Sequence, residues 1–136
     1  MRNIYYLILT VCISCNSINF SEKPNIILIV ADDLGYGDLS IFGNEYISTP
    51  NIDKLGHEGI IMTDFHSNGS VCSPTRAALL TGKYQQKVGV PGVITAKNHR
   101  DKGLPIDEKT FAEIAKEVGY KTGIFGKWHL GYDPKF

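Results

Sequence analysis

Three segments along the chain predict β-strands. The first, residues 25–31, is a continuous and mostly β-branched apolar run that follows a proline, and residues 60–66 and 121–125 are two further strand candidates. A continuous apolar run of this length is typical of a strand that is covered on both faces of a parallel sheet. We therefore expect a strand at each of the three positions.

Two other segments carry the signals of a helix with a stabilised first turn. Thr49 and Pro50 supply a capping residue and a first-turn proline, and nearby glycines end the short apolar stripe that follows. Residues 110–113 match a capping box, and the apolar residues after it recur at helical spacing until Gly119. These patterns predict one helix after Pro50 and another after Thr110.

A further helix is expected between these two. Ser73 and Pro74 are again a capping residue and a first-turn proline, and Gly82 ends the segment. Cys72 then lies at a helix N-terminus. The stretch over residues 89–103 is rich in turn residues and charges, so we expect a long surface loop there.

The order of these elements indicates a fold class. Strand and helix patterns alternate along the chain, which favours an α/β fold with a mainly parallel sheet flanked by helices. The sequence stops just past a motif, at residues 134–136, with no closing element. We therefore expect it to be the N-terminal part of a longer protein, with the sheet incomplete in this chain.

The composition narrows the classes of function. The 136 residues include 14 basic and 14 acidic side chains, so the net charge gives no indication of nucleic-acid binding. A hydrophobic fraction of 43% argues against a disordered tail. Three cysteines are too few for a disulfide scaffold.

The N-terminus has the pattern of an export signal. Arg2 precedes an apolar run over residues 4–13, which is too short to span a bilayer of roughly 30 Å as a helix. Ser14 lies directly before Cys15, as at the cleavage site of a bacterial lipoprotein. We expect a signal peptide over residues 1–14, a tether over 15–24 and the first part of a catalytic domain over 25–136.

Export would place the protein in the periplasm or on the outer membrane of a bacterium. Plain secretion is the main alternative to a lipid anchor, because Cys12 stands where the lipoprotein pattern usually has Leu or Val, and a cytosolic start is the other alternative. If Cys15 carries the lipid and Cys12 is removed, Cys72 has no cysteine partner, which is unusual in an exported protein.

Two adjacent carboxylates end the first apolar run. Asp32 and Asp33 follow the expected strand at its carboxyl end, where open α/β sheets bind ligands. Like charges this close are costly unless a cation or a shifted pKa relieves them, and a hard divalent cation would do so. The alternative is that the pair only caps a turn. A calcium shell needs roughly six to eight oxygens, so other ligands would have to complete it.

A cysteine and an arginine lie one turn apart in the segment C-S-P-T-R. A helix N-terminus offers free N–H groups and a positive partial charge, which suit an anionic substrate or an ionised Cys72. Arg76 can hold an oxyanion with its fork of donors. Taken singly, a buried apolar thiol is the better interpretation of Cys72, and a surface helix charge is the better interpretation of Arg76.

Four segments together resemble the type I sulfatase family. Residues 72–83, C-S-P-T-R-A-A-L-L-T-G-K, resemble the family signature. Residues 25–37 resemble the family's strand with its Asp-Asp pair, T-P-N-I-D at 49–53 resembles a second motif, and G-K-W-H-L-G at 126–131 a third. Their order and spacing are far more specific than any one segment, and the resemblance extends from about Pro24 to the end.

The resemblance implies the alkaline phosphatase-like fold and a modified cysteine. In this family a formylglycine-generating enzyme oxidises the cysteine of C-x-P-x-R to formylglycine. By resemblance, Cys72 becomes formylglycine, which acts as nucleophile and metal ligand, and Asp32 and Asp33 are ligands of one Ca²⁺ ion. The family's remaining metal ligands and catalytic groups come from later in the chain.

The resemblance also implies roles for three cationic or basic side chains. Arg76 would hold the hydrated aldehyde, and Lys127 and His129 would contact the sulfate and the formylglycine hydroxyls. The cations would offset charge that gathers on the sulfuryl oxygens, and His129 would take the proton whose removal expels sulfate. We expect Trp128 to pack so that it fixes its two neighbours.

These implications predict hydrolysis of sulfate esters, with sulfated carbohydrates as the expected substrates of an exported enzyme. A phosphate or phosphonate ester hydrolase of the same fold is the alternative within enzymes. A non-catalytic, glycan-binding surface lipoprotein is the alternative outside them. We also expect that this chain by itself folds poorly, because half a parallel sheet leaves an edge and an apolar face uncovered.

Overall fold

The computed structural model describes residues 23–136. The chain divides into two units, residues 1–30 and 31–136, and we describe each by itself. The expected signal peptide, Cys15 and nearly all of the tether lie outside the described residues.

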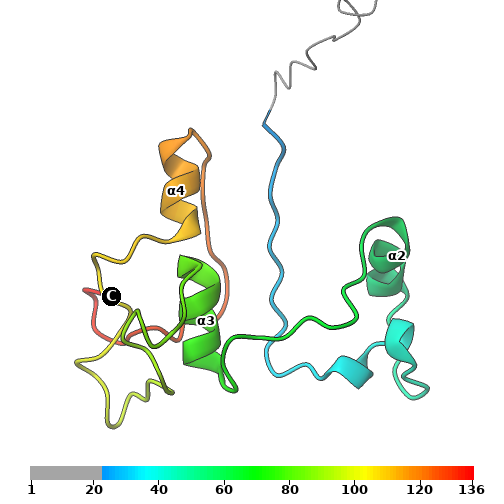
Figure 1. Cartoon of the computed structure of the whole chain (residues 1–136), viewed down its shortest axis with the longest axis horizontal. Coiled ribbons are helices and arrows are strands. Elements are labelled where there is room, and N and C mark those ends of the chain that lie inside the picture. Colours follow the sequence, from blue (N-terminus) through cyan, green and yellow to red (C-terminus); the bar gives the residue numbers. More distant parts are fainter. Residues whose placement is uncertain (1–22) are drawn as a thin grey trace, which may run out of the picture. The chain divides into compact units, whose positions relative to one another are not determined.

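The elements in chain order are the 3₁₀ turns η1 (Tyr36–Asp38) and η2 (Ser40–Phe42) and the helices α2 (Pro50–Glu58), α3 (Cys72–Thr81) and α4 (Phe111–Glu117) (Figure 1). Within residues 23–136, no helix has the length and apolar character needed to cross a membrane.

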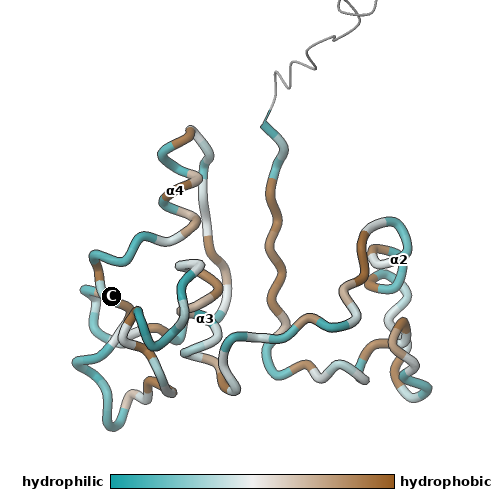
Figure 2. Tube along the Cα trace, in the orientation of Figure 1, coloured by the Kyte–Doolittle hydropathy of each residue, from teal (hydrophilic) through white to brown (hydrophobic). Residues whose placement is uncertain are grey.

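The three strand predictions are wrong. Residues 25–31, 60–66 and 121–125 contain no β-strand, and the described part of the chain has no sheet at all. The side chains of these runs are exposed, with Ile27 84% and Phe125 98% accessible, and Figure 2 shows the first run as a hydrophobic stretch of extended chain. A strand of a parallel sheet needs neighbours that take its backbone hydrogen bonds and cover its two faces. None of these runs pairs with another.

Helix α2 begins and ends as predicted. Thr49 is its N-cap residue, a proline occupies the first turn, and Gly59 is its C-cap. The hydroxyl of Thr49 does not cap a helix N–H but donates a 2.8 Å hydrogen bond to Oδ1 of Asp53. The hydroxyl of Ser40 donates to Oδ2 of the same carboxylate at 2.5 Å. These bonds hold the pKa of Asp53 below its ordinary value, the bond from Ser40 contributing most.

Helix α2 packs closely on η2. A Cβ atom at Gly56 would lie 2.6 Å from Cδ1 of Ile41, so a larger residue could not occupy this position without a shift. Ile41 also donates its backbone N–H to Asp53 at 3.1 Å. The T-P-N-I-D segment thus ties α2 to the turn before it through one carboxylate and one close approach.

Helix α3 begins earlier than predicted. Val71 is the N-cap residue and Cys72 the first residue of the helix, so the prediction that Ser73 caps it is wrong. Ser73 is instead fully buried, and its hydroxyl accepts a hydrogen bond from the backbone N–H of Ile94 at 3.1 Å. The predicted end is confirmed, since Gly82 has a φ of 66° and its N–H bonds to the Ala78 carbonyl.

Helix α4 forms the predicted capping box. The hydroxyl of Thr110 accepts from the N–H of Glu113, and the Glu113 carboxylate accepts from the N–H of Thr110 at 2.8 Å. The apolar stripe of this helix is only partly covered, because Ile114 remains 50% exposed.

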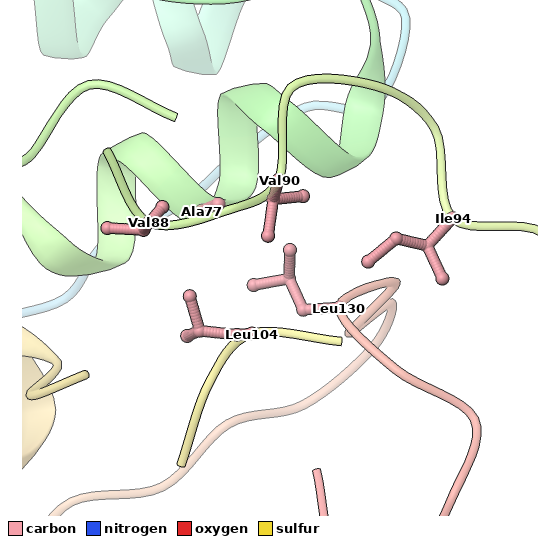
Figure 3. Close-up of a cluster of buried hydrophobic side chains, with 6 residues drawn as sticks. All are labelled: Ala77, Val88, Val90, Ile94, Leu104 and Leu130. Atoms are coloured by element: carbon pink, nitrogen blue, oxygen red, sulfur yellow. The ribbon is translucent and has the colours of Figure 1, made fainter. Parts of the chain in front are cut away.

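A small core forms where α3 meets the loops on either side of α4 (Figure 3). Its buried side chains are Ala77, Val88, Val90, Ile94, Leu104 and Leu130. The prediction of a surface loop over residues 89–103 is therefore wrong in part: the loop has no helix or strand, but Val90 and Ile94 are 2% and 4% exposed. Burial of an apolar side chain contributes favourable free energy. Irregular backbone can be buried with it at little cost in free energy, provided that its N–H and C=O groups are hydrogen-bonded.

The segment around Leu130 is tied to the far end of the same loop. The N–H of Leu104 donates to the carbonyl of Leu130 at 2.8 Å, and Gly103 and Gly131 form an isolated antiparallel bridge. Trp128 packs against the core as expected for a residue that fixes its neighbours. The core therefore holds residues 126–131 against α3.

Shortening the buried side chain of Leu130 tests this packing. Leu130→Ala is expected to lower the free energy of unfolding by about 2–5 kcal/mol, because it removes apolar contacts and leaves a cavity. Urea denaturation followed by circular dichroism measures the change. Tyr46 is 98% exposed, so Tyr46→Ala is the control and should change stability by less than about 0.5 kcal/mol. Equal stability of the two variants would contradict the packing.

Candidate active site

The Asp32 carboxylate joins two cations from distant parts of the chain. Nη2 of Arg76 donates to Oδ1 at 2.8 Å, and Nζ of Lys127 donates to Oδ2 at 2.6 Å. The three residues come from the start of the second unit, from α3 and from the segment after α4. The structure thus brings together three of the residues that the sequence singled out.

Arg76 is the most enclosed member of this cluster. Its side chain is 15% exposed, against 41% for Asp32 and 39% for Lys127. Besides its bond to Asp32, it donates from Nη1 to the backbone carbonyl of Lys127 at 2.7 Å. Its Nε is buried and has no hydrogen-bond partner. The guanidinium is therefore held from two sides and retains one unused donor.

The two ion pairs shift the pKa values of both partners. The hydrogen bond from Lys127, followed by that from Arg76, lowers the pKa of Asp32 below its ordinary value. The hydrogen bond to Asp32 raises the pKa of Lys127, and the negative charge of Asp32 adds to the effect.

Cys72 is a free, partly exposed thiol in the first turn of α3. A helix N-terminus carries unpaired N–H groups and a positive partial charge, which favour an anion. Cys72 and Arg76 share this end of α3, four residues apart, so they lie on neighbouring turns of one face.

His129 occupies a restrained position beside the core. Its φ of 55° is in the left-handed region, which residues other than glycine rarely adopt. Its Nε2 lies 2.9 Å from the carbonyl oxygen of Ile94, while Nδ1 is buried without a hydrogen-bond partner. The buried Leu130 follows it directly and fixes the backbone there.

Asp33 stands apart from its neighbour. It is exposed, has a φ of 58° and forms no hydrogen bond or ion pair with the rest of residues 23–136. No three His, Cys, Asp or Glu side chains in this described part form a group that could hold a metal ion. The expected calcium ligands Asp32, Asp33 and Cys72 are thus not assembled as a group of three, and Asp32 is engaged by cations instead.

The sequence reasoning missed the parts that Ser73 and Ile94 play at this site. A serine directly after the candidate nucleophile is a visible signal, although its position before Pro74 favours the interpretation of a helix cap. Ile94 contributes through its backbone N–H and C=O, which no residue type reveals. Both groups connect α3 to His129.

The shifted pKa values determine how the cluster responds to pH. The pKa of Asp32 is lowered on folding, so its ion pairs stabilise the fold above the pKa of the unfolded carboxyl group. That stabilisation is lost as the pH falls through the lower, folded pKa. The pKa of Lys127 is raised, so its contribution is present below the ordinary lysine pKa and lost as the pH rises through the raised one.

Carboxyl ¹³C NMR titration tests this arrangement. Asp32 is expected to titrate below its ordinary pKa of 3.8, and Lys127→Met should move that midpoint upward because the strongest of its hydrogen bonds is removed. Lys54 pairs only with the exposed Glu58 in its own helix, so Lys54→Met is the control and should leave the Asp32 midpoint unchanged. An upward shift in both variants, or in neither, would argue against the contact.

Comparisons with known proteins agree on one family. The family model described as Sulfatase matches residues 24–136. The chain is 51% identical over 116 residues to arylsulfatase A of Bos taurus and 44% identical over 118 residues to steryl-sulfatase of Homo sapiens. These matches cover 85% and 82% of this chain but 22% and 20% of the relatives, so the chain spans about a fifth of their length.

Solved structures resemble the chain as well. The crystal structure of Ps i-CgsB has a TM-score of 0.79 and 44% sequence identity, and the match covers 84% of this chain and 25% of that one. A Bacteroides thetaiotaomicron protein described as BT33336S-sulf has a TM-score of 0.72 and 41% identity, with 83% of this chain and 23% of that one covered. These relatives imply the alkaline phosphatase-like fold. The chain belongs to the sulfatase family, as the family model shows over nearly all of the described residues.

Proposed function

We propose that the protein to which this chain belongs hydrolyses sulfate esters to an alcohol and inorganic sulfate. The observation that carries the proposal is the cluster of Asp32, Arg76 and Lys127, with Cys72 one helical turn before Arg76 in α3. Two cations meet one carboxylate there, which leaves one positive charge unpaired, and the N-terminus of α3 adds a further positive partial charge. A sulfate group carries the charge that this site lacks.

Arg76 and Lys127 would hold the sulfuryl oxygens. Both cations are anchored through Asp32, and the Lys127 carbonyl also orients Arg76. Charge gathers on these oxygens while the S–O bond to the alcohol breaks, so fixed cations stabilise the transition state more than the ground state.

Cys72 is the proposed nucleophile position, after oxidation to formylglycine. The hydrated aldehyde would supply a hydroxyl that attacks sulfur and a second hydroxyl whose deprotonation allows sulfate to leave. His129 would accept that proton, since its Nδ1 has no hydrogen-bond partner in the structure. The position of residue 72 in the first turn of α3, where the helix N-terminus carries a positive partial charge, supports a negatively charged group there.

Asp32, Asp33 and residue 72 would hold the calcium ion. The fit is in the donor chemistry: both aspartates offer the hard oxygens that Ca²⁺ prefers, Asp33 has no partner among the described residues, and each Asp32 oxygen keeps a second lone pair beside its hydrogen bond. When bound, Ca²⁺ would make a coordinated hydroxyl easier to deprotonate. Two carboxylates are too few for a calcium shell, so other groups would complete it.

Sulfated carbohydrates are the proposed substrates. One solved relative at 43% identity is Ps i-CgsB in complex with k-i-k-neocarrahexaose, and the Bacteroides protein is described with the metabolism of glycosaminoglycans. An exported protein would meet such polymers before they enter a cell. We also propose that residues 1–14 direct this export and that Cys15 carries a lipid.

Modification of Cys72 is the first test of the proposed chemistry. Mass spectrometry of the protein made in its native host is expected to show residue 72 as an aldehyde or its hydrate, lighter than or distinct from cysteine. Cys72→Ala and Arg76→Ala should each lower turnover of a small aryl sulfate by about 10³-fold or more, because a nucleophile and a transition-state donor are lost.

The control for these variants is Arg100→Ala, which removes an exposed guanidinium whose only recorded bond is to the Ala96 carbonyl. It should retain turnover. A free thiol at residue 72 in protein from the native host would favour the glycan-binding alternative. Turnover of aryl phosphates in preference to aryl sulfates would favour the phosphate ester hydrolase instead.

Lipid attachment at Cys15 has its own test. Growth of the host with an alkyne-tagged palmitate should label the wild-type protein, because the cysteine at the cleavage site takes the lipid. Cys15→Ser is expected to abolish the label, and Cys72→Ser, the matched control, should retain it. Secretion of an unlabelled wild-type protein would contradict the anchor and favour a plain signal peptide.

A further inference from the structure

The peptide group of Ile94 links α3 to His129 through two hydrogen bonds. Its N–H donates to Oγ of Ser73 at 3.1 Å, and its carbonyl oxygen lies 2.9 Å from Nε2 of His129. Ser73 is fully buried and Ile94 is 4% exposed, so water does not compete for the first of these bonds. Ser73 directly follows Cys72 in α3.

The second bond determines which imidazole nitrogen carries the proton. A carbonyl oxygen can only accept a hydrogen bond, so Nε2 must be the donor and must be protonated. In the neutral ring Nδ1 is then bare. Nδ1 is buried and has no hydrogen-bond partner, so no bond of its own opposes this assignment.

We infer that Ser73 and the Ile94 peptide group are positioning elements that hold His129 as its Nε2-protonated tautomer, with Nδ1 as the atom that accepts a proton. The inference deepens the proposed function, on which it rests for the origin of that proton. Ser73 acts by orienting the Ile94 peptide group, and Ile94 acts by fixing the imidazole. Neither needs to touch the substrate.

The alternative tautomer is disfavoured on both sides of the ring. Protonation at Nδ1 would place a donor where the structure offers no acceptor, and it would turn the Nε2 lone pair toward the lone pairs of the Ile94 oxygen. The backbone of His129 is held in place by the fully buried Leu130 that follows it, and the hydrogen bond to the Ile94 carbonyl orients the ring. These contacts favour one tautomer and one direction of the imidazole.

The arrangement also links the base to the nucleophile position. Ser73 and Cys72 are successive residues of one helix, so a peptide group bonded to Ser73 keeps His129 in a set position relative to residue 72. A shift of about 1 Å between reacting groups can lower a rate substantially. Ser73 therefore matters for turnover even though its hydroxyl is buried.

Nitrogen NMR of histidine-labelled protein reads the tautomer directly. At a pH where the ring is neutral, the two-bond ¹H–¹⁵N spectrum of the wild-type protein is expected to show Nε2 as the protonated nitrogen of His129 and Nδ1 as the bare one. His129→Gln identifies the signal. A protonated Nδ1 in the wild-type protein would overturn the inference without any need for a variant to fold.

Ser73→Ala tests the second half of the arrangement. It leaves the Ile94 N–H unpaired, so the His129 signals should shift toward a mixture of tautomers, and kcat for a small aryl sulfate should fall by about tenfold with KM unchanged. Thr81→Ala is the matched control, because its hydroxyl bonds only to Ala77 and Lys83 at the other end of α3. It should leave the His129 spectrum and kcat unaltered.

Two outcomes separate this inference from the proposed function. Wild-type His129 signals that do not change in Ser73→Ala would overturn the positioning part. The second outcome is that the wild-type protein shows the expected tautomer and Ser73→Ala shows the expected change, but the wild-type protein hydrolyses no sulfate ester. That result would support the hydrogen-bond assignment and refute the proposed function.

Discussion

One carboxylate holds the candidate site together. Asp32 accepts one hydrogen bond on each oxygen, from Arg76 and from Lys127, and these donors lie 44 and 95 residues further along the chain. Side chains so far apart in sequence meet only if the loops between them are closed, which costs conformational entropy. A pair of charge-assisted bonds to one group is the kind of contact that can offset part of this cost. The lowered pKa of Asp32 records the same interaction.

The small apolar core keeps the segments that carry the site residues packed against one another, in addition to the contacts of the Asp32 carboxylate. Leu130 and Ala77 are completely buried and come from the two segments that carry His129 and Arg76. Burial of apolar side chains has no preferred direction, so packing alone would not set how the polar groups face one another. The hydrogen bonds around Ile94 and Asp32 supply that direction. Core and polar contacts thus determine different properties of the site, its compactness and its orientation.

Local signals in the sequence predicted the helices well. Pro50, the capping box at residues 110–113 and Gly82 act through neighbours within one turn, so their effect does not depend on the rest of the fold. The strand predictions failed because a strand depends on partners elsewhere, and apolar pattern alone does not supply them. The cap of α3 was placed two residues late, since the buried Ser73 bonds to Ile94 rather than to its own helix.

The site residues could be named from sequence motifs, while their connections could not. Arg76, Lys127 and Asp32 were singled out by resemblance, and the structure adds that they contact one another. Contacts made by backbone groups leave no trace in the residue type, which is why Ile94 escaped notice. Ser73 indicates such a contact better than Ile94 does, because a serine hydroxyl that becomes buried next to a candidate nucleophile needs a hydrogen-bond partner.

The two adjacent aspartates have different environments. Both oxygens of Asp32 already serve cations of the chain itself, so its charge is largely balanced within the protein. Asp33 is exposed and has no partner among residues 23–136 that would balance its charge. Two equal carboxylates side by side would repel each other, and the repulsion is smaller when one of them is neutralised. An incoming cation would therefore find Asp33 free to bind, whereas it could bind Asp32 only through the lone pairs that Arg76 and Lys127 leave unused.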